Sequence, residues 1–201
     1  MPDDCVAVLL AAGAGSRFAG PGHKLAAMLP ATGSRPAATV IERSLDHALA
    51  AAIGTVVVVT GAAPDIVPAS YRERVELRHN PRWAEGQSTS LRAGLDAAAD
   101  LGARCVVVGL ADQPLVEADA WRAVAAGDTP IAVATYDGRR GNPVKLDVAV
   151  WPLLDRHAAA DPDAGARSLM RVRPDLVGEV PCPGSPDDVD TEEDLRRWQK
   201  S

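Results

Sequence analysis

Short apolar runs of strand length recur along the chain, and this recurrence constrains the fold more than any other feature. The strongest runs are CVAVLL, TVVVVT and CVVVGL, and VELRH and IAVATY are weaker candidates. A strand reads as a nearly continuous Val/Leu run when helices cover both of its faces. Ala/Leu-rich helical patterns separate the runs, at 39–52, 88–101 and 117–126. The sequence therefore predicts a doubly wound α/β fold, with a mostly parallel sheet and helices on both faces.

Two segments interrupt this alternation. PGHKLAAMLPATGSRPAATV is rich in Gly and Pro and has no clear period, so we predict a long functional loop or a small flap there. YDGRRGNPVKL contains DG and GN turn signals, which are typical of a hairpin. A length of 201 residues suits one compact domain, so we expect a single domain that spans residues 1–201.

The composition argues against several classes of function. The chain has 21 Lys and Arg against 27 Asp and Glu, a net charge of −6, and only 3% aromatic residues. Nucleic-acid interfaces need clustered basic side chains and often stacking rings, so no nucleic-acid partner is expected. No apolar stretch reaches the ~18 residues of a membrane span. The acidic start MPDDCVAVLL also lacks the basic region of a signal peptide. We therefore expect a cytoplasmic protein with no membrane partner.

The cysteines and histidines form no recognisable cluster. Cys5, Cys105 and Cys182 are far apart and include no CxxC pair, so neither a disulfide framework nor a zinc site is expected. Cys5 and Cys105 each open a Val-rich run and are interpreted as buried thiols. The sequence has no GxSxG motif and no readable Ser/His/Asp arrangement, which disfavours a covalent hydrolase.

A glycine-rich segment follows the first predicted strand, at the edge of the sheet where α/β proteins bind ligands. Gly13 and Gly15 allow the backbone to approach an anion closely, and Arg17 and Lys24 supply positive charge for a polyphosphate. The segment is neither a GxxxxGK[ST] phosphate loop nor a dinucleotide-binding loop, whose third glycine is replaced by Phe18. The alternatives are a plain glycine-rich turn and a solvated surface lysine.

Two aspartates are candidate metal ligands. Asp112 follows CVVVGL, and a carboxylate at the end of that strand suits Mg²⁺, a hard cation usually shared with substrate phosphates. The alternative for Asp112 is an N-cap or turn residue ahead of Pro114. Asp190 alternates with Val189 before the last predicted helix, so it could point inward and complete the site. The acidic residues after it are interpreted as a solvated helix start: Glu192, Glu193 and Asp194.

A third candidate segment, HNPRWAEGQSTSLRAGL, follows the run VELRH. Gly86 and Ser88 lie where its loop becomes a helix, and a helix N-terminus offers backbone donors to an anion or to the edge of a base. The alternative is that Ser88 only caps the helix.

These motifs occur in the order seen in a known family: LLAAGAGSRF with Lys24 downstream, NPRWAEGQSTSLRAGL, LADQP, GRRGNPV and VDTEEDL. The sequence resembles the MobA-like nucleotidyltransferases and is most similar, within them, to the molybdenum cofactor cytidylyltransferases. The resemblance covers nearly the whole chain and implies a Rossmann-like fold, a nucleoside triphosphate donor and Mg²⁺ as cofactor. The segment HKLAAMLPATGSRPAAT is longer than its usual counterpart in the family.

The resemblance also implies a role for each candidate residue. The triphosphate would be bound by the first loop and the lysine that follows it: Ala11, Ala12, Gly13, Gly15, Ser16, Arg17 and Lys24. Asp112 and Asp190 would hold Mg²⁺, and catalysis would depend on Asp112 together with Arg17 and Lys24. Gly86 and Ser88 would contact the nucleotide, and Asn142 and Pro143 would lie near the acceptor.

The predicted function is nucleotidyl transfer to a phosphorylated small molecule, with release of pyrophosphate. CTP is the favoured donor, because Ala11, Ala12 and Gly13 read AAG where guanylyl relatives usually have AGG. The expected acceptor is of the molybdopterin type, and a molybdoenzyme that receives the product is a further expected partner. The alternatives are guanylyl transfer to molybdopterin, transfer to a sugar phosphate, and a non-catalytic module that binds a nucleotide or cofactor.

Overall fold

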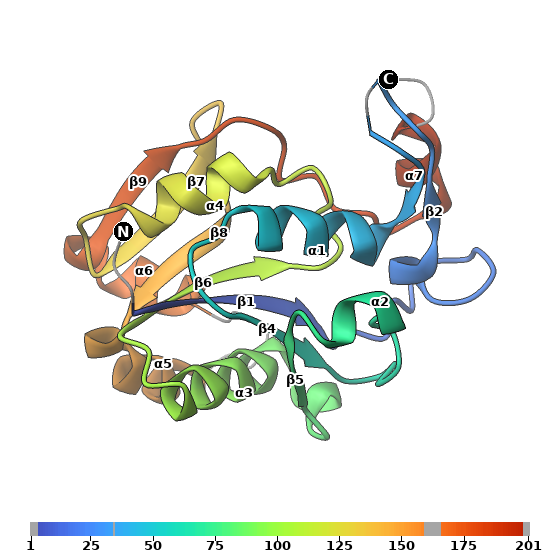
Figure 1. The fold of residues 1–201 in the computed structure, drawn as a ribbon. Helices are drawn as coiled ribbons and strands as arrows, with labels where there is room; N and C mark the ends of the chain where they lie inside the picture. The colour runs from blue at the N-terminus through green and yellow to red at the C-terminus, as the bar shows by residue number, and fades with distance from the viewer. Residues whose placement is uncertain (1–3, 34, 159–165, 199–201) are drawn as a thin grey trace.

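A seven-stranded sheet forms the centre of the molecule, with the strand order β5-β4-β1-β6-β8-β7-β9 (Figure 1). The computed structural model describes residues 4–33, 35–158 and 166–198. The strands of this sheet are β1 (Cys5–Ala11), β4 (Val56–Thr60), β5 (Glu76–His79), β6 (Cys105–Leu110), β7 (Ile131–Tyr136), β8 (Arg139–Asp147) and β9 (Val177–Pro181). β8 pairs antiparallel with β6 and β7, and the other pairs are parallel. The predicted mostly parallel sheet is therefore confirmed.

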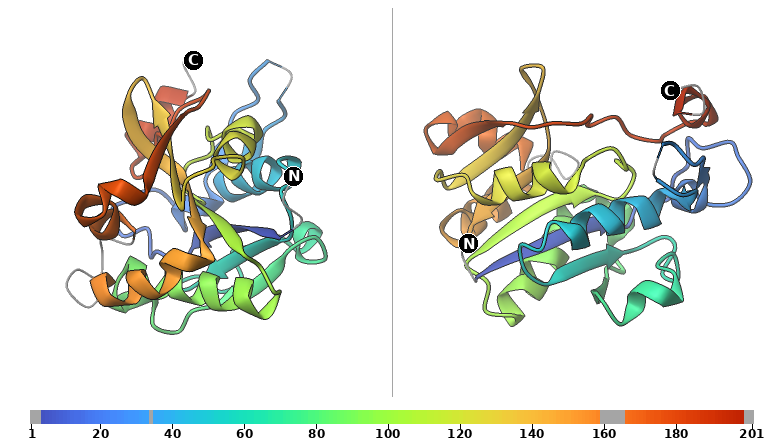
Figure 2. Two further views of the ribbon diagram at one scale, coloured as in Figure 1. Left: turned by 90° about the vertical axis from the view of Figure 1, so that its left-hand side faces the viewer. Right: turned by 45° about the horizontal axis from the view of Figure 1, so that its top comes forward.

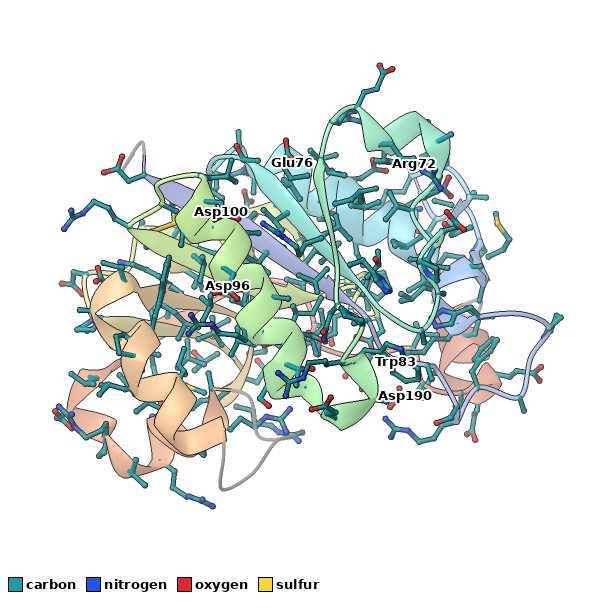
Figure 3. The ribbon with its side chains drawn as sticks, turned by 90° about the horizontal axis from the view of Figure 1, so that it is seen from below. Arg72, Glu76, Trp83, Asp96, Asp100 and Asp190 are labelled. Carbon is teal, nitrogen blue, oxygen red and sulfur yellow. A yellow bond between two sulfur atoms is a disulfide. The ribbon has the colours of Figure 1, made fainter. Side chains whose placement is uncertain are left out.

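Helices cover both faces of the sheet, as the Val-rich runs predicted (Figure 2). The α-helices are α1 (Val40–Ala50), α2 (Ala69–Arg72), α3 (Gln87–Asp100), α4 (Ala118–Ala125), α5 (Trp151–Ala158), α6 (Arg167–Val172) and α7 (Glu192–Trp198). Side chains alternate along β1: Ala7 and Leu9 belong to the core under α1 and α4, whereas Val6 and Val8 belong to the core over α3 and α5. Figure 3 shows α3 in front of the sheet, with the exposed Asp96 on it.

The order of the strands creates a switch point beside β1. The chain passes from β1 to β4 and β5 on one side, and then returns to β6 on the other side of β1. In open α/β sheets, ligands bind outside the carboxyl ends of the strands at such a point. The loop that follows Ala11 and the turn that contains Asp112 therefore meet at one edge of the sheet.

The irregular segment after the first loop forms a small flap. A 3₁₀ helix, η1 (Lys24–Ala26), leads into an antiparallel pair of two-residue strands, β2 (Met28–Leu29) and β3 (Ala38–Thr39). Thr39 then begins α1 through a capping box with Glu42, in which each side chain accepts from the other residue's backbone N–H. An ion pair between Arg35 and Glu117 links the flap to the start of α4.

The predicted hairpin is also confirmed, as β7 and β8 joined by Asp137 and Gly138. Both of these residues have positive φ, 50° and 75°, the conformation that favours Asp and Gly in tight hairpin turns. The segment after β9 runs along the molecule to α7, which lies beside the flap (Figure 1). This path brings Asp190 close to the switch point.

One sequence prediction is wrong. Cys5 and Cys105 are buried, as expected, but they form a disulfide rather than two separate thiols. The parallel register of β1 and β6 places the two residues directly opposite each other, with Cα atoms 4.8 Å apart. Their sequence separation of 100 residues gave no sign of this pairing. Cys182 is a free cysteine.

Candidate active site

The loop after β1 folds over Lys24. Gly15 has φ +62°, a conformation that favours glycine, and a Cβ at this position would also lie only 3.0 Å from Cγ of Lys24. The His23 side chain also contacts the loop, with Nε2 2.9 Å from the carbonyl oxygen of Gly13. The loop and the lysine are therefore a single structural unit, although 10 residues separate Gly13 from His23.

Lys24 joins the two candidate metal ligands. Its Nζ donates to Oδ2 of Asp112 at 2.6 Å and to Oδ1 of Asp190 at 2.8 Å, and only 11% of its side chain is exposed. Burial lowers the pKa of Lys24, but the charges and hydrogen bonds of Asp112 and Asp190 outweigh this effect and raise the pKa above its usual value. The lysine therefore stays charged and keeps the two carboxylates together.

Arg17 adds a second positive charge at the mouth of the cluster. Its guanidinium forms an ion pair of 2.8 Å with Oδ2 of Asp190, while 75% of the arginine side chain is exposed. The arginine can therefore turn toward an incoming anion at little cost, since exposed ion pairs contribute ~0–1 kcal/mol. Desolvation and the negative charges of Asp190 and Asp112 raise the pKa of Asp188, which shows how acidic this corner is.

Backbone contacts hold the two aspartates in place. Asp112 lies two residues beyond β6, and its carbonyl oxygen accepts a hydrogen bond of 2.8 Å from the backbone N–H of Val189. Val189 is fully buried and anchors the segment, so the next residue, Asp190, faces Lys24. A capping box between Thr191 and Asp194 then starts α7. The alternative of Asp112 as an N-cap is wrong, because α4 begins later, after Glu117.

The donor set suits a divalent metal ion. Oδ1 of Asp112 is buried and has no hydrogen-bond partner among the described residues, and an unsatisfied buried carboxylate oxygen is costly unless a cation or donor meets it. Carboxylates are the ligands that Mg²⁺ and similar hard cations prefer. The described residues contain no cluster of three or more His, Cys, Asp or Glu side chains arranged for a metal. The two aspartates fit a metal that takes its remaining ligands from substrate phosphates and water.

A small pocket opens above this cluster, with a volume of about 250 Å³. It is formed by the first loop, Lys24 and the two aspartates, and its lining residues are Leu10, Ala11, Gly13, Ala14, Gly15, Ser16, Arg17, Lys24, Leu25, Asp112 and Asp190. Nearly all the residues that the sequence assigned to triphosphate and metal binding thus come together here. Ala12 is the exception, because it is buried and does not line the pocket.

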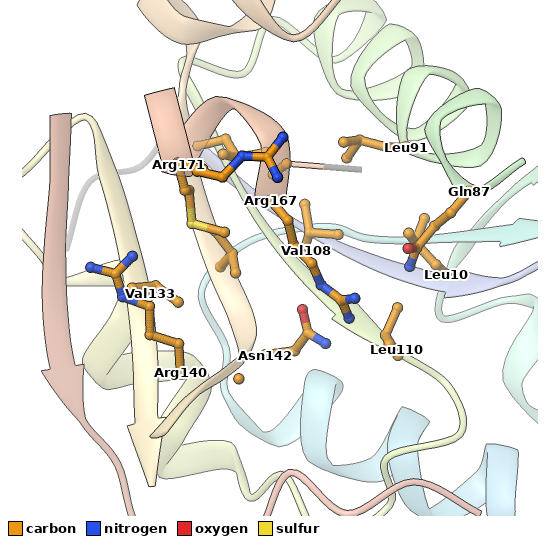
Figure 4. Close-up of a pocket in the computed structure, with 15 residues that line it drawn as sticks. Leu10, Gln87, Leu91, Val108, Leu110, Val133, Arg140, Asn142, Arg167 and Arg171 are labelled. Atoms are coloured by element: carbon orange, nitrogen blue, oxygen red, sulfur yellow. The ribbon is translucent and has the colours of Figure 1, made fainter. Parts of the chain in front are cut away.

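A large pocket of about 440 Å³ lies next to the small one, and Leu10 lines both (Figure 4). Asn142 lines the large pocket, whereas Pro143 is buried behind it. Gly86 and Ser88 line neither pocket, but Gln87 between them lines the large one. Ser88 does not cap α3 either, because Gly86 is the N-cap and no side chain caps this helix.

Gln113 connects the two pockets, and the sequence analysis did not single it out. This buried residue follows Asp112; its Nε2 donates to the carbonyl oxygen of Pro186, and its Oε1 accepts from Nδ2 of Asn142. These hydrogen bonds link the turn after β6, the segment that leads to Asp190, and β8.

The sequence analysis also did not single out Arg140, Arg167 and Arg171 of the large pocket. The spacing of the last two, four residues apart on one helix, was the available signal.

Comparisons with known proteins identify relatives of this chain. The model of the MobA-like NTP transferase domain family matches residues 7–178. Among solved structures, Rv0371c from Mycobacterium tuberculosis H37Rv is 28% identical over 100% of both chains, with a TM-score of 0.76. A nucleotidyl transferase from Methanothermobacter thermautotroptrophicus is 23% identical, covers 98% of this chain and 97% of its own, and has a TM-score of 0.78.

A second structure of Rv0371c, in complex with manganese, is 23% identical over 98% of this chain and 99% of its own, with a TM-score of 0.68. No curated protein is similar enough in sequence to count as a match. Within the described ranges, no helix is both long and apolar enough to cross a membrane. Because the family model covers most of the chain, this protein belongs to the MobA-like NTP transferases.

Proposed function

We propose that this nucleotidyltransferase transfers CMP from CTP to the phosphate of a small acceptor of the molybdopterin type and releases pyrophosphate. The observation that carries the proposal is the cluster of Lys24, Arg17, Asp112 and Asp190 in the small pocket, directly beside the large pocket that shares Leu10. A polyphosphate and a second molecule bound in these pockets would meet beside Leu10.

The reaction needs positioning and charge neutralisation rather than a protein nucleophile. An oxygen of the acceptor phosphate forms a bond to the α-phosphorus, and the bond from that phosphorus to the bridging oxygen of the β-phosphate breaks. Pyrophosphate leaves with the electron pair of that bond. The second pKa of a phosphate is ~6, so the acceptor is already ionised near neutral pH and gives up no proton. This agrees with a cluster that contains no histidine among its charged groups.

Each charged residue has a defined task in this proposal. Lys24 and Arg17 bind the β- and γ-phosphates and offset the charge that develops on pyrophosphate. Asp112 and Asp190 would hold Mg²⁺, which would act as a Lewis acid on the phosphate oxygens. Backbone N–H groups of the loop from Ala11 to Ser16 would contact the remaining phosphate oxygens.

The large pocket is the proposed site of the acceptor. Asn142 lines it, and the hydrogen bond from Asn142 to Gln113 fixes the side chain relative to Asp112. Pro143 is buried beside Asn142 in the chain and is proposed to contribute shape rather than a polar contact. Gly86 and Ser88 lie on either side of Gln87 and are proposed to position the nucleotide.

The preference for CTP is proposed from the AAG start of the first loop and the resemblance to the cytidylyl branch. Cytosine presents an amino donor and a carbonyl acceptor on its Watson–Crick edge, whereas guanine is larger and inverts part of that pattern. A pocket with fixed donors and acceptors rejects the wrong base, because each mismatched buried polar group costs ~1–3 kcal/mol. Two mismatches would give a preference of roughly a hundredfold, since ~1.4 kcal/mol corresponds to tenfold.

The test is pyrophosphate release from CTP, GTP, ATP and UTP, each with Mg²⁺ or Mn²⁺ and with or without molybdopterin. We expect release that requires both CTP and molybdopterin. Pyrophosphate release with GTP and molybdopterin would make the enzyme a guanylyltransferase. Pyrophosphate release that requires a sugar phosphate instead of molybdopterin would make the sugar phosphate the acceptor. Nucleotide binding with no release under any condition would contradict an enzymatic role.

A further inference from the structure

We infer that the ligand of the large pocket has an apolar body, a reacting group near Leu10, and a second anionic group that Arg140 and Arg171 bind away from Leu10. The inference rests on the proposed function only where it calls this ligand the acceptor. The pocket's chemistry stands independently of that function.

The floor of the large pocket is apolar. Its volume of about 440 Å³ lies within the ~300–1,000 Å³ typical of small-molecule sites. Buried apolar side chains from β6, β7, β8, α3 and α6 form the floor: Leu91, Val108, Val133, Val144, Leu146 and Met170. Such a floor gains free energy by covering a flat or compact apolar body, at ~25 cal/mol per Å² removed from water.

The charged residues of the lining all have one sign. They are Arg140 on β8 and Arg167 and Arg171 on α6, and no Asp or Glu lines the pocket among the residues that the structure describes. Arg140 pairs with Glu179 through its Nε, and its guanidinium carries four further N–H donors. Arg167 and Arg171 are four residues apart, so they lie on one face of α6. Three positive groups over an apolar floor favour an anionic ligand over a neutral one or a cation.

The arrangement of the charges indicates a second anionic group. In Figure 4, Leu10 and Gln87 lie on one side of the pocket, Arg140 lies on the opposite side, Arg171 lies across the top, and Arg167 reaches into the middle. Leu10 also lines the small pocket, so a reacting phosphate must approach at that side. Arg140 and Arg171 therefore face a different part of the same ligand. Arginine suits this role because its planar donors bind carboxylates, phosphates and sulfonates in pairs.

The test uses two fluorescent probes of similar shape, without nucleotide or metal. 8-Anilinonaphthalene-1-sulfonate is aromatic and anionic, and N-phenyl-1-naphthylamine is its neutral counterpart. We expect the wild type to bind the sulfonate at least tenfold more tightly than the amine. Arg171→Gln combined with Arg140→Gln should raise the Kd of the sulfonate about tenfold, the value for loss of one or two charge-assisted hydrogen bonds. The Kd of the amine should change less than twofold.

Two variants control the experiment. Arg173→Gln removes an arginine that is two positions further along, pairs with Asp175 and does not line the pocket, so it should leave both constants unchanged. Arg171→Lys keeps the charge and should retain sulfonate binding within about threefold. The inference is overturned if the wild type does not prefer the sulfonate, if the double variant binds it normally, or if both probes lose affinity equally. Because neither nucleotide nor metal is present, failure here is distinct from failure to release pyrophosphate.

Discussion

The small and large pockets share Leu10 but hold their charges in opposite ways. In the small pocket, Lys24 and Arg17 already pair with Asp112 and Asp190, so every cation is balanced by a carboxylate. In the large pocket, the arginines lie over an apolar floor, among the described residues only Arg140 pairs with a carboxylate, that of Glu179, and no described Asp or Glu lines the pocket. The first arrangement suits a metal together with a polyphosphate, which must exchange partners with the protein. The second suits a ligand that brings its own negative charge.

The largest expected effect comes from Asp112→Asn, which removes a carboxylate charge from the small pocket. We expect pyrophosphate release to fall at least a hundredfold, because loss of a ligand to a catalytic metal costs several kcal/mol, roughly 3 or more. The melting curve should change little, and Asp175→Asn, at an exposed ion pair, should keep normal activity. Activity of Asp112→Asn within threefold of the wild type would refute its role as a metal ligand.

Lys24→Met should separate metal binding from turnover. The ammonium group occupies carboxylate oxygens of both aspartates, so removing it should tighten Mn²⁺ binding without nucleotide about fivefold, or ~1 kcal/mol. Pyrophosphate release should nevertheless fall about tenfold or more, because the outgoing phosphates lose a cation. Electron paramagnetic resonance of Mn²⁺ measures the first effect.

The control for Lys24→Met is Arg78→Met, which removes a positive charge from β5, the edge strand of the sheet. It should alter neither Mn²⁺ affinity nor turnover. Weaker Mn²⁺ binding in Lys24→Met would contradict competition between the ammonium group and the metal.

Asn142→Ala tests the large pocket through its KM. We expect the KM for the acceptor to rise about tenfold, the equivalent of one or two hydrogen bonds, while the KM for CTP stays within twofold. Steady-state kinetics with each substrate varied in turn measures both constants. A rise confined to the KM for CTP would indicate that Asn142 contacts the nucleotide rather than the acceptor.

Removing the disulfide should affect activity least, because the small pocket, with its charged cluster, lies beyond the carboxyl ends of β1 and β6, whereas Cys5 and Cys105 begin these strands. Replacing both residues by Ala should lower the melting temperature by roughly 5–15 °C, if the bond contributes ~2–4 kcal/mol. Turnover at 25 °C should stay within twofold. A large loss of turnover with an unchanged melting temperature would indicate coupling between the two ends of these strands.

The fold could be predicted because its strongest signal is local. The Val-rich runs of β1, β4 and β6 need helices on both faces, and the order of strand and helix then implies a doubly wound sheet. The pairing of the strands was harder to predict from the sequence. The insertion of β8 between β6 and β7, and the register that pairs Cys5 with Cys105, depend on contacts across the whole sheet.

The two pockets also differ in how far the sequence could predict their residues. Lys24, Asp112 and Asp190 follow recognisable motifs, so they could be named although 88 and 166 residues separate the lysine from its partners. The hydrogen bonds of Lys24 to both aspartates could not be predicted, since they depend on atomic distances. The large pocket draws its lining from several elements, and Arg167 and Arg171 belong to no motif used above.

The most direct test of the central claim is a competition between CTP and GTP at equal concentration, with Mg²⁺ and molybdopterin, read as pyrophosphate and as nucleotidylated product by mass spectrometry. The account predicts one pyrophosphate for each cytidylylated molecule, a preference for CTP of roughly a hundredfold, and loss of both signals in Asp112→Asn. A preference for GTP would contradict the choice of CTP. Pyrophosphate from neither nucleotide, or equal release by Asp112→Asn, would contradict nucleotidyl transfer at this site.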